Sequence, residues 1–198
     1  PYYDKLVDVV ADYMKKISEI TGRDYKPFNY YGAPDAKYVI VTMGSAAGCV
    51  QETVDYLRKQ GAKVGFIEVH LYRPFSAQYF LSQLPATVEA ITVGDRTKEP
   101  GAVGEPLYED VSSVVLESDR KLKVFACRYG LASKDFTPAQ VIAMYKNMEA
   151  KEPKNHYTIG INDDVTHLSL PYGKEINIIQ EGTISCKFWG LGSDGTVG

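Results

Sequence analysis

Cysteine is scarce in this chain of 198 residues, which contains three Cys, three His and one Trp. Cys49, Cys127 and Cys186 lie far apart and form no Cys-x-x-Cys pair, so the sequence contains no recognisable zinc or iron–sulfur motif. We expect each thiol to be a small buried side chain rather than a reactive one. The three histidines show no spacing that would place two of them on one helix face, so we predict no metal site within this chain.

A long apolar run is also missing, and neither sign of charge dominates. No stretch approaches the roughly 20 apolar residues that cross a bilayer, and the first residues lack the pattern of a signal peptide. The net charge of −3 gives no reason to expect nucleic acid or an acidic membrane as a partner. We expect a soluble chain in the cytoplasm or another reducing compartment.

What the sequence does contain is a repeated alternation of strand and helix patterns. Apolar, β-branched runs predict strands over residues 38–43, 64–71, 88–93 and 123–127. Helical spacing predicts helices between them, and the longer ones cover residues 49–60, 106–116 and 138–150. Ser76 and Thr137 are predicted N-caps. This alternation predicts an α/β fold of three layers, with a mainly parallel sheet and helices on both faces.

The two ends of the chain depart from this alternation. Apolar residues at helical spacing predict a first helix over residues 4–20 that packs on the domain as an arm through one buried stripe. The predicted stripe consists of Leu6, Val9, Val10, Tyr13, Ile17 and Ile20. Residues 24–35, rich in Tyr, Pro and Gly, predict a connector, and residues 156–161 an edge strand. We therefore expect a helix and connector over 1–35, an α/β domain over 36–175, and a further domain beginning near 180.

The last residues form a Gly-x-Gly-x-x-Gly pattern, Gly190 to Gly195, after a predicted strand. Such a turn holds a phosphate when the N-terminus of a following helix supplies backbone N–H groups. No helix follows here, which predicts that the sequence is a piece of a longer polypeptide. The pattern alone leaves phosphate binding and a plain turn both open, and Trp189 could stack on a base or pack in a core.

Two further loops lie where a parallel sheet binds ligands. Residues 44–48 are small, but they lack the lysine of a P-loop and the spacing of a dinucleotide motif, so we interpret them as a tight turn. In the charged loop 95–105, Arg96 and Lys98 could bind an anion, and Glu99 or Glu105 could act as an acid or base. Because the charges alternate in sign, we favour an interdomain salt-bridged loop formed by these four residues.

The carboxylate pair Asp163–Asp164 could bind a divalent cation, but a turn or cap formed by Asp164 is the simpler interpretation. No nucleophile and base stand at a spacing that forms a catalytic set. We predict no catalytic residue in this chain.

Seven segments together resemble one enzyme family. They are Tyr-Val-Ile-Val-Thr-Met-Gly-Ser (38–45), Leu-Tyr-Arg-Pro-Phe-Ser (71–76), Leu-Pro-Ala-Thr (84–87), Asp-Arg-Thr-Lys-Glu-Pro-Gly (95–101), Gly-Glu-Pro-Leu-Tyr (104–108), Arg-Tyr-Gly-Leu (128–131) and Lys-Phe-Trp-Gly-Leu-Gly-Ser-Asp-Gly-Thr-Val-Gly (187–198). In this order they resemble pyruvate:ferredoxin (flavodoxin) oxidoreductase. The resemblance implies a transketolase C-terminal-like domain up to about residue 175, followed by the start of a gamma-type domain associated with coenzyme A.

The resemblance also implies a function for the longer protein. Members of the family are multidomain, usually dimeric enzymes that oxidatively decarboxylate pyruvate to acetyl-CoA and CO₂ and reduce ferredoxin or flavodoxin. Other domains would hold thiamine diphosphate, Mg²⁺ and the 4Fe–4S clusters, so this piece itself would bind no cofactor and be inactive alone. It would lie in the cytoplasm or in an anaerobic organelle such as a hydrogenosome. The residues matching the family's coenzyme A loop are Trp189, Gly190, Leu191, Gly192, Ser193 and Asp194.

Two alternatives remain beside this interpretation. One is the homologous domain of a multidomain protein of the sulfite reductase type, and the other is a free-standing nucleotide-binding module. The reading frame around the segment would separate them, since each predicts a different downstream neighbour.

Overall fold

The computed structural model describes residues 2–163, 165–179 and 182–189, and it contains one six-stranded sheet. The strands are β1 (Phe28–Gly32), β2 (Tyr38–Met43), β3 (Val64–Val69), β4 (Ala90–Asp95), β5 (Lys123–Arg128) and β6 (Tyr157–Thr158). They lie in the order β1-β3-β2-β4-β5-β6, and all neighbouring pairs are parallel except β1 with β3. The predicted mainly parallel sheet is confirmed.

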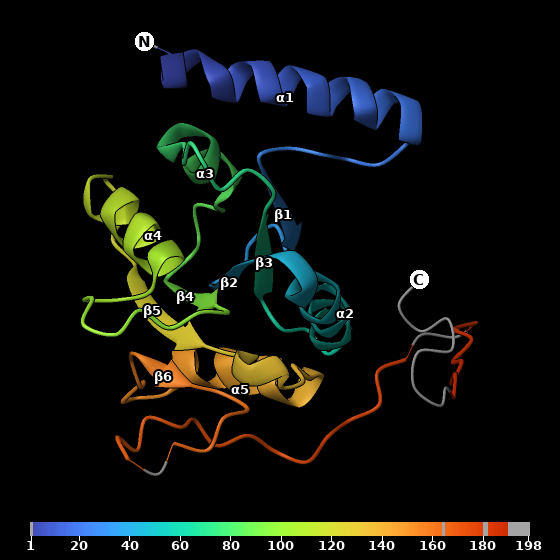
Figure 1. Ribbon diagram of the computed structural model, residues 1–198, viewed down its shortest axis with the longest axis vertical. Helices are drawn as coiled ribbons and strands as arrows, with labels where there is room; N and C mark the ends of the chain where they lie inside the picture. The colour runs from blue at the N-terminus through green and yellow to red at the C-terminus, as the bar shows by residue number, and fades with distance from the viewer. Residues whose placement is uncertain (1, 164, 180–181, 190–198) are drawn as a thin grey trace.

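Helices cover both faces of this sheet (Figure 1). On one face α2 (Ala47–Arg58) and α5 (Pro138–Glu149) form a buried core with β-strand residues such as Ile40. On the other, α3 (Ala77–Gln83) and α4 (Pro106–Leu116) do so with strand residues that include Val39. Successive side chains of a strand point to opposite faces, so an apolar run such as β2 needs a cover on both sides. This confirms the three-layer α/β fold.

Strand β1 corrects the expectation of a connector over residues 24–35. Phe28 to Gly32 pair antiparallel with β3 at the edge of the sheet, with Phe28 opposite Val69 and Gly32 opposite Gly65. Phe28 is buried, and its ring contacts the rings of Phe75 and Phe80. A strand of only five residues shows little hydrophobic periodicity in its sequence. Its strand conformation depends on pairing with β3, which the sequence of β1 does not reveal.

Helix α1 (Tyr2–Thr21) forms as predicted, but of the predicted stripe only Leu6 and Val10 are partly buried. Val7 is the buried apolar residue of this helix, whereas Tyr13, Ile17 and Ile20 of the predicted stripe are exposed. Val9 is exposed as well. Apolar residues surround more than half of the helix, so their spacing predicts a helix without selecting the face that meets the domain.

The predicted caps have different outcomes. The Ser76 hydroxyl accepts a hydrogen bond from the Tyr79 N–H at 3.4 Å, which confirms it as the N-cap of α3. Thr137 precedes α5, but its hydroxyl donates to Glu175 at 3.0 Å instead of capping the helix. Thr137 is thus the N-cap residue and Pro138 follows it at the start of the helix, as predicted, but the Thr137 side chain makes no capping hydrogen bond.

We expect Ser76→Ala to lower the free energy of unfolding by about 1 kcal/mol, because the first turn of α3 loses its side-chain acceptor. Urea unfolding of the chain measures this difference. Ser82→Ala is the matched control, since Ser82 lies inside the same helix, where alanine is the better helix former. Equal losses in the two variants would contradict a capping role for Ser76.

After α5 the chain forms only the short strand β6 within the predicted range 156–161. The turn that follows is organised by Asp163, whose carboxylate accepts hydrogen bonds from three backbone N–H groups, those of Val165, Thr166 and Leu168. These bonds, with one from the Thr166 hydroxyl, lower the pKa of Asp163. The turn interpretation thus holds for Asp163, while Asp164 lies outside the described residues. Within the described ranges, no helix is long and apolar enough to cross a membrane.

Candidate functional site

The loops that follow the parallel strands meet at the carboxyl edge of the sheet. β2 lies between β3 and β4, so the chain winds first to one side of β2 and then to the other. Ligands of open α/β sheets bind at such a reversal, outside the carboxyl ends of the two strands. A small cavity of about 180 Å³ lies at this place, lined by residues that include Ser45, Arg96, Tyr129 and Lys134.

Arg96 joins three of these loops. Its Nη1 donates to the Ser45 hydroxyl at 2.9 Å, in the loop after β2, and its Nε donates to the Gly130 carbonyl at 3.2 Å, in the loop after β5. A Cβ at position 130 would lie 2.9 Å from Arg96 Nε, so the close approach requires glycine there. Arg96 remains exposed at the surface while it makes these two contacts, and whether it also binds an anion stays a prediction.

The tight turn predicted over residues 44–48 is present beside Arg96. Gly44 has a φ of +74°, a left-handed conformation that glycine adopts without strain. Ala46 and Ala47 then enter the core at the start of α2. Small side chains therefore serve the packing of this turn.

Asp95, the last residue of β4, accepts hydrogen bonds from the N-terminus of α4. Its two carboxylate oxygens bind the N–H groups of Leu107 and Tyr108, each at 3.1 Å. Burial raises the pKa of Asp95 to about 6, although both hydrogen bonds act in the opposite direction. The carboxylates of Glu105 and Asp110 nearby add to the increase. Asp95 thus holds α4 against the sheet, and its charge is costly at neutral pH.

This shift predicts a pH-dependent stability. The pKa of Asp95 in the folded chain exceeds the ordinary value of 3.8, so its contribution is complete below that value and is lost as pH rises through about 6. We expect the unfolding free energy of the wild type, relative to Asp95→Ala, to be about 2 kcal/mol greater at pH 4.5 than at pH 7. Urea unfolding at both pH values measures it.

Asp163→Ala is the matched control for this experiment. The pKa of Asp163 is lowered, so the advantage of the wild type over Asp163→Ala should shrink as pH falls. A pH-independent difference between the wild type and Asp95→Ala would contradict the assignment of the raised pKa to Asp95.

Glu105 and Arg128 form an ion pair within the domain. Glu105 Oε1 lies 3.4 Å from Arg128 Nε, and the side chains are 5% and 14% exposed. The contact lacks the geometry of a hydrogen bond, but Arg128 Nη2 donates to the His156 carbonyl at 3.0 Å. The pair connects the start of α4 to the end of β5. It thereby joins the two elements that lie beside Asp95 at the carboxyl edge of the sheet.

The four residues predicted to face another domain therefore differ in their surroundings. Glu105 is buried against Arg128, and Arg96 contacts Ser45 and Gly130. Lys98 and Glu99 are exposed on the loop after β4. An interdomain contact for these residues stays a prediction, and the two exposed ones have side chains available for it.

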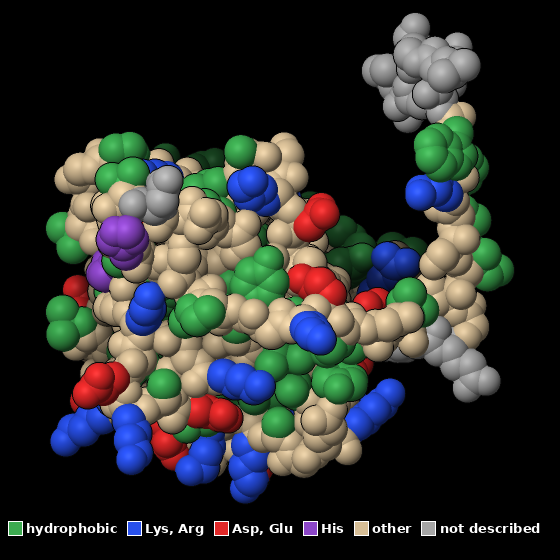
Figure 2. All heavy atoms as spheres, turned by 90° about the horizontal axis from the view of Figure 1, so that it is seen from below, with side chains coloured by type: hydrophobic (Ala, Val, Ile, Leu, Met, Phe, Trp, Pro, Cys, Tyr) green, Lys and Arg blue, Asp and Glu red, His purple; other side chains and the backbone are tan. Residues whose placement is uncertain are grey.

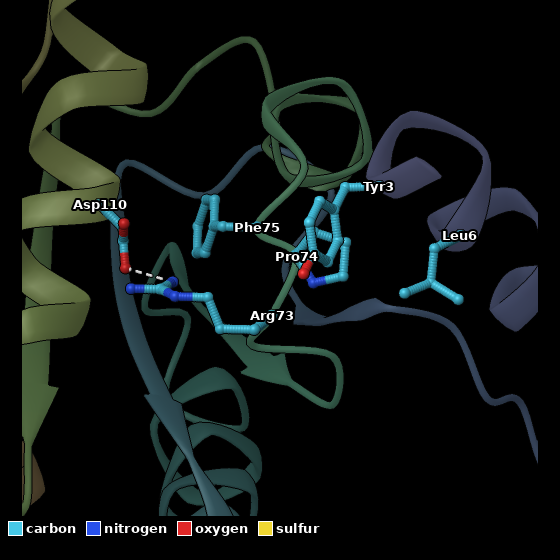
Figure 3. A pocket seen from close by; sticks show the side chains of 6 residues that line it. All are labelled: Tyr3, Leu6, Arg73, Pro74, Phe75 and Asp110. Carbon is cyan, nitrogen blue, oxygen red and sulfur yellow. Dashed lines mark hydrogen bonds and ion pairs between the residues drawn. The ribbon is translucent and has the colours of Figure 1, made fainter. Parts of the chain in front are cut away.

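A second cavity, of about 580 Å³, lies between α1 and the loop after β3 (Figure 3). Tyr3 and Leu6 of α1 line one side, and the loop residues Arg73 and Phe75 line the other. Arg73 Nη1 forms an ion pair with Asp110 of α4 at 2.7 Å. The Arg73 guanidinium also lies 3.9 Å from the centroid of the Tyr72 ring, and Figure 3 shows it extended beside Phe75 toward Asp110. The cavity is therefore mainly apolar, and the Arg73–Asp110 ion pair lies in its wall.

A third hollow lies beneath α2 and α5, where residues 170–176 cross the surface. This groove of about 710 Å³ is lined by apolar side chains that include Leu57, Ile142 and Ile176, together with Lys146 and Lys174. Figure 2 shows this side of the molecule, with hydrophobic side chains gathered near the crossing segment and Lys and Arg side chains around them. It has the composition of a contact surface rather than of a reaction centre.

Two of the three thiols have a raised pKa. Burial raises the pKa of Cys49 to about 11 and raises that of the fully buried Cys127 further, so both stay protonated at neutral pH. Cys127 is buried as expected, but Cys49 is only partly buried and Cys186 is exposed, which corrects the expectation for these two. Among the described residues there is no group of three or more His, Cys, Asp or Glu side chains arranged to hold a metal ion.

Most of the predicted coenzyme A loop, Gly190 to Asp194, lies outside the described residues. Trp189 precedes it with its side chain 87% exposed, and Lys187 Nζ lies 5.1 Å from the centroid of its ring. The ring is therefore open to contact. Its role toward coenzyme A stays a prediction.

Asp95, Arg128, Arg73 and Asp110 were missed as site residues by the sequence patterns. The available signal was a charged residue at the end of an apolar strand, as at Asp95 and Arg128. That position places a side chain at the carboxyl edge. The partner it meets there comes from another element, which the pattern does not reveal.

The part of the chain that contains this carboxyl edge matches a known protein family. A family model described as pyruvate:ferredoxin oxidoreductase core domain II matches residues 36–141, from just before β2 to the first turn of α5. The chain belongs to this family. Core domain II is thus the α/β unit whose carboxyl edge is described above, and the match favours the first interpretation of the sequence over its two alternatives.

The sequence similarity to known proteins extends beyond core domain II and covers the whole chain. The chain is 54% identical over its full length to pyruvate:ferredoxin oxidoreductase of Moorella thermoacetica and 52% identical to pyruvate-flavodoxin oxidoreductase of Enterobacter agglomerans. It spans 17% of the length of each. A mitochondrial pyruvate dehydrogenase [NADP(+)] of Euglena gracilis is 49% identical over the whole chain, which covers 11% of that protein.

A solved structure of 2-oxoglutarate:ferredoxin oxidoreductase from Magnetococcus marinus, with 2-oxoglutarate, coenzyme A and succinyl-CoA bound, aligns with 69% of this chain and 22% of its own. The TM-score is 0.47 and the sequence identity 22%, a likeness too distant to support an inference about this chain.

Proposed function

We propose that this chain is core domain II of a multidomain enzyme that oxidises pyruvate. In the proposed reaction, pyruvate and coenzyme A yield acetyl-CoA, CO₂ and one proton, and two electrons pass to ferredoxin or flavodoxin. The identity of this whole chain to part of a pyruvate:ferredoxin oxidoreductase and of a pyruvate-flavodoxin oxidoreductase supports the reaction. We place the enzyme in the cytoplasm or an anaerobic organelle, as a homodimer.

The proposed task of this domain is to position its neighbours rather than to react. The single observation that carries this proposal is that two ion pairs, Arg128 with Glu105 and Arg73 with Asp110, engage charged side chains at its carboxyl edge. Side chains engaged in this way are fixed structural supports and are poorly suited to proton transfer. The 4Fe–4S clusters would bind to other domains, because the three thiols of this chain lie far apart in sequence. Thiamine diphosphate and Mg²⁺ would bind to other domains as well.

The domain boundaries are a further part of this proposal. We propose that residues 36–175 form the transketolase C-terminal-like unit, and that the preceding residues 1–35 contribute helix α1 and the edge strand β1 to it. Residues from about 180 would begin the coenzyme A domain, where Trp189 and the glycine turn approach the pyrophosphate through backbone N–H groups.

The test uses the full-length polypeptide that contains this chain, purified without oxygen. It should reduce a viologen dye, ferredoxin or flavodoxin when pyruvate and coenzyme A are both present. Gly192→Val should raise the KM for coenzyme A and leave the KM for pyruvate unchanged, while Val103→Ala, an exposed position far from the glycine turn in sequence, should change neither. If the enzyme oxidised another 2-oxo acid but not pyruvate, the proposed substrate would be wrong. Equal changes in both KM values would overturn the role of the glycine turn.

A further inference from the structure

Helix α1 has an unusually apolar outer face. We use this name for Tyr2, Val9, Tyr13, Ile17 and Ile20, whose side chains are exposed. Four of them, Tyr2, Val9, Tyr13 and Ile20, follow one another at 7, 4 and 7 residues, a spacing that keeps them on one side of an α-helix. The exposed fractions of Tyr2 and Ile20 at its ends are 74% and 84%, and those of the residues between them are 48% to 61%. Lys16 Nζ lies 4.8 Å from the centroid of the Tyr13 ring. A continuous apolar stripe of this length marks an interaction surface.

The orientation of α1 is fixed by its opposite side. Val7 is buried there, the Asp8 carboxylate accepts a hydrogen bond of 2.8 Å from the Tyr79 hydroxyl of α3, and the Ser18 hydroxyl accepts one of 2.8 Å from the Tyr25 N–H. Figure 1 shows α1 lying across one end of the molecule, beyond α3. The outer face therefore points away from the domain, and turning it inward would break these contacts.

The composition of α1 favours a protein partner over a lipid surface. The helix contains three Lys against four Asp and Glu residues, whereas helices that lie on anionic membranes carry an excess of Lys and Arg. Tyrosine, present twice in the outer face, is enriched at protein interfaces because it buries a large ring at low entropic cost.

We propose that a neighbouring domain of the same polypeptide packs on the outer face of α1 with an apolar surface. The relatives supply the partner's origin, since this chain spans only 17% of their length and the rest is available for the contact. The surface continues at the start of α1 into the cavity lined by Tyr3, Leu6 and Phe75, where the partner would meet the Arg73–Asp110 pair at its edge (Figure 3). This inference rests on the proposed function, because it requires the multidomain protein.

The test places a benzophenone amino acid at Tyr13 in the full-length enzyme, a replacement that keeps an aromatic ring. After irradiation, mass spectrometry should find Tyr13 joined to a peptide from outside residues 1–198 of the same polypeptide. Glu19 is the matched control, since it is exposed on the polar side of α1 and should give no such product. Mixing isotopically heavy and light protein before assembly separates links within one chain from links between two copies.

Each result decides the proposal. A link from Tyr13 to another domain of the same chain supports it. Links only to a second copy, only to added lipid vesicles, or no more linking than at Glu19 would each overturn it. Pyruvate oxidation is measured on the same preparation, so an active enzyme without the link refutes the contact alone, whereas an inactive enzyme with the link refutes the proposed reaction alone.

Discussion

Replacing Arg128 with methionine is expected to lower the free energy of unfolding by about 3 kcal/mol, because it leaves the buried carboxylate of Glu105 without its counter-charge. Methionine keeps most of the length of the side chain, so the loss reflects charge more than volume. The His156 carbonyl also loses its donor, which at 3.0 Å is the shorter of the two contacts of Arg128. Urea unfolding at pH 7 measures the difference.

The matched control removes both charges. Arg128→Met combined with Glu105→Gln should recover much of the loss, since neither member of the pair then leaves an unpaired buried charge. Arg96→Met should cost much less, because the Arg96 guanidinium is exposed and bonds to neutral groups. If the double variant were no more stable than Arg128→Met, the ion pair would not be the reason for the loss.

Gly32→Ala is expected to destabilise the chain by about 3 kcal/mol or more, since two separate costs combine at this position. A Cβ at residue 32 would lie 2.5 Å from Gly65 Cα and 2.7 Å from the Val64 carbonyl oxygen, both of them backbone atoms that move only with the sheet. The φ of Gly32 is +144°, a conformation that side chains disfavour. The antiparallel pairing of β1 with β3 depends on this close approach.

Gly61→Ala separates the two costs. Gly61 also has a positive φ, of +86°, but a Cβ there would meet no atom within 4 Å. It should therefore show only the conformational cost, about 1 kcal/mol. Urea unfolding compares the two variants, and the β1 amide protons report the local effect by hydrogen exchange. Similar losses in both variants, with β1 still protected, would show that the backbone contact is unimportant.

Much of the fold could be predicted because its signals are local. The apolar runs of β2 to β5 and the helical spacing of α2, α4 and α5 each lie within one short segment, and the alternation of these segments leads to a parallel sheet. The loop 95–105 was recognised for the same reason, since charged residues after an apolar strand stand at the carboxyl edge. The family resemblance extended this to one domain of the pyruvate:ferredoxin oxidoreductase family, and the family match confirms that family.

The remainder depended on contacts between segments far apart in the chain. Arg96 meets Ser45 and Gly130, and Glu105 meets Arg128, only because β4 lies between β2 and β5. An alternation of strands and helices fits several strand orders, and periodicity does not distinguish them. Partners that lie far apart in sequence were therefore invisible until the order β1-β3-β2-β4-β5-β6 was known.

The ends of the chain show the same division between local pattern and distant contact. The sequence specifies a helix over residues 2–21 and a short aromatic segment over 28–32, because backbone hydrogen bonding and side-chain spacing act between near neighbours. Which side of α1 meets the domain, and that the aromatic segment pairs with β3, follow from packing free energy summed over many distant residues. That sum exists only in the folded molecule, so the outer face of α1 became visible only there.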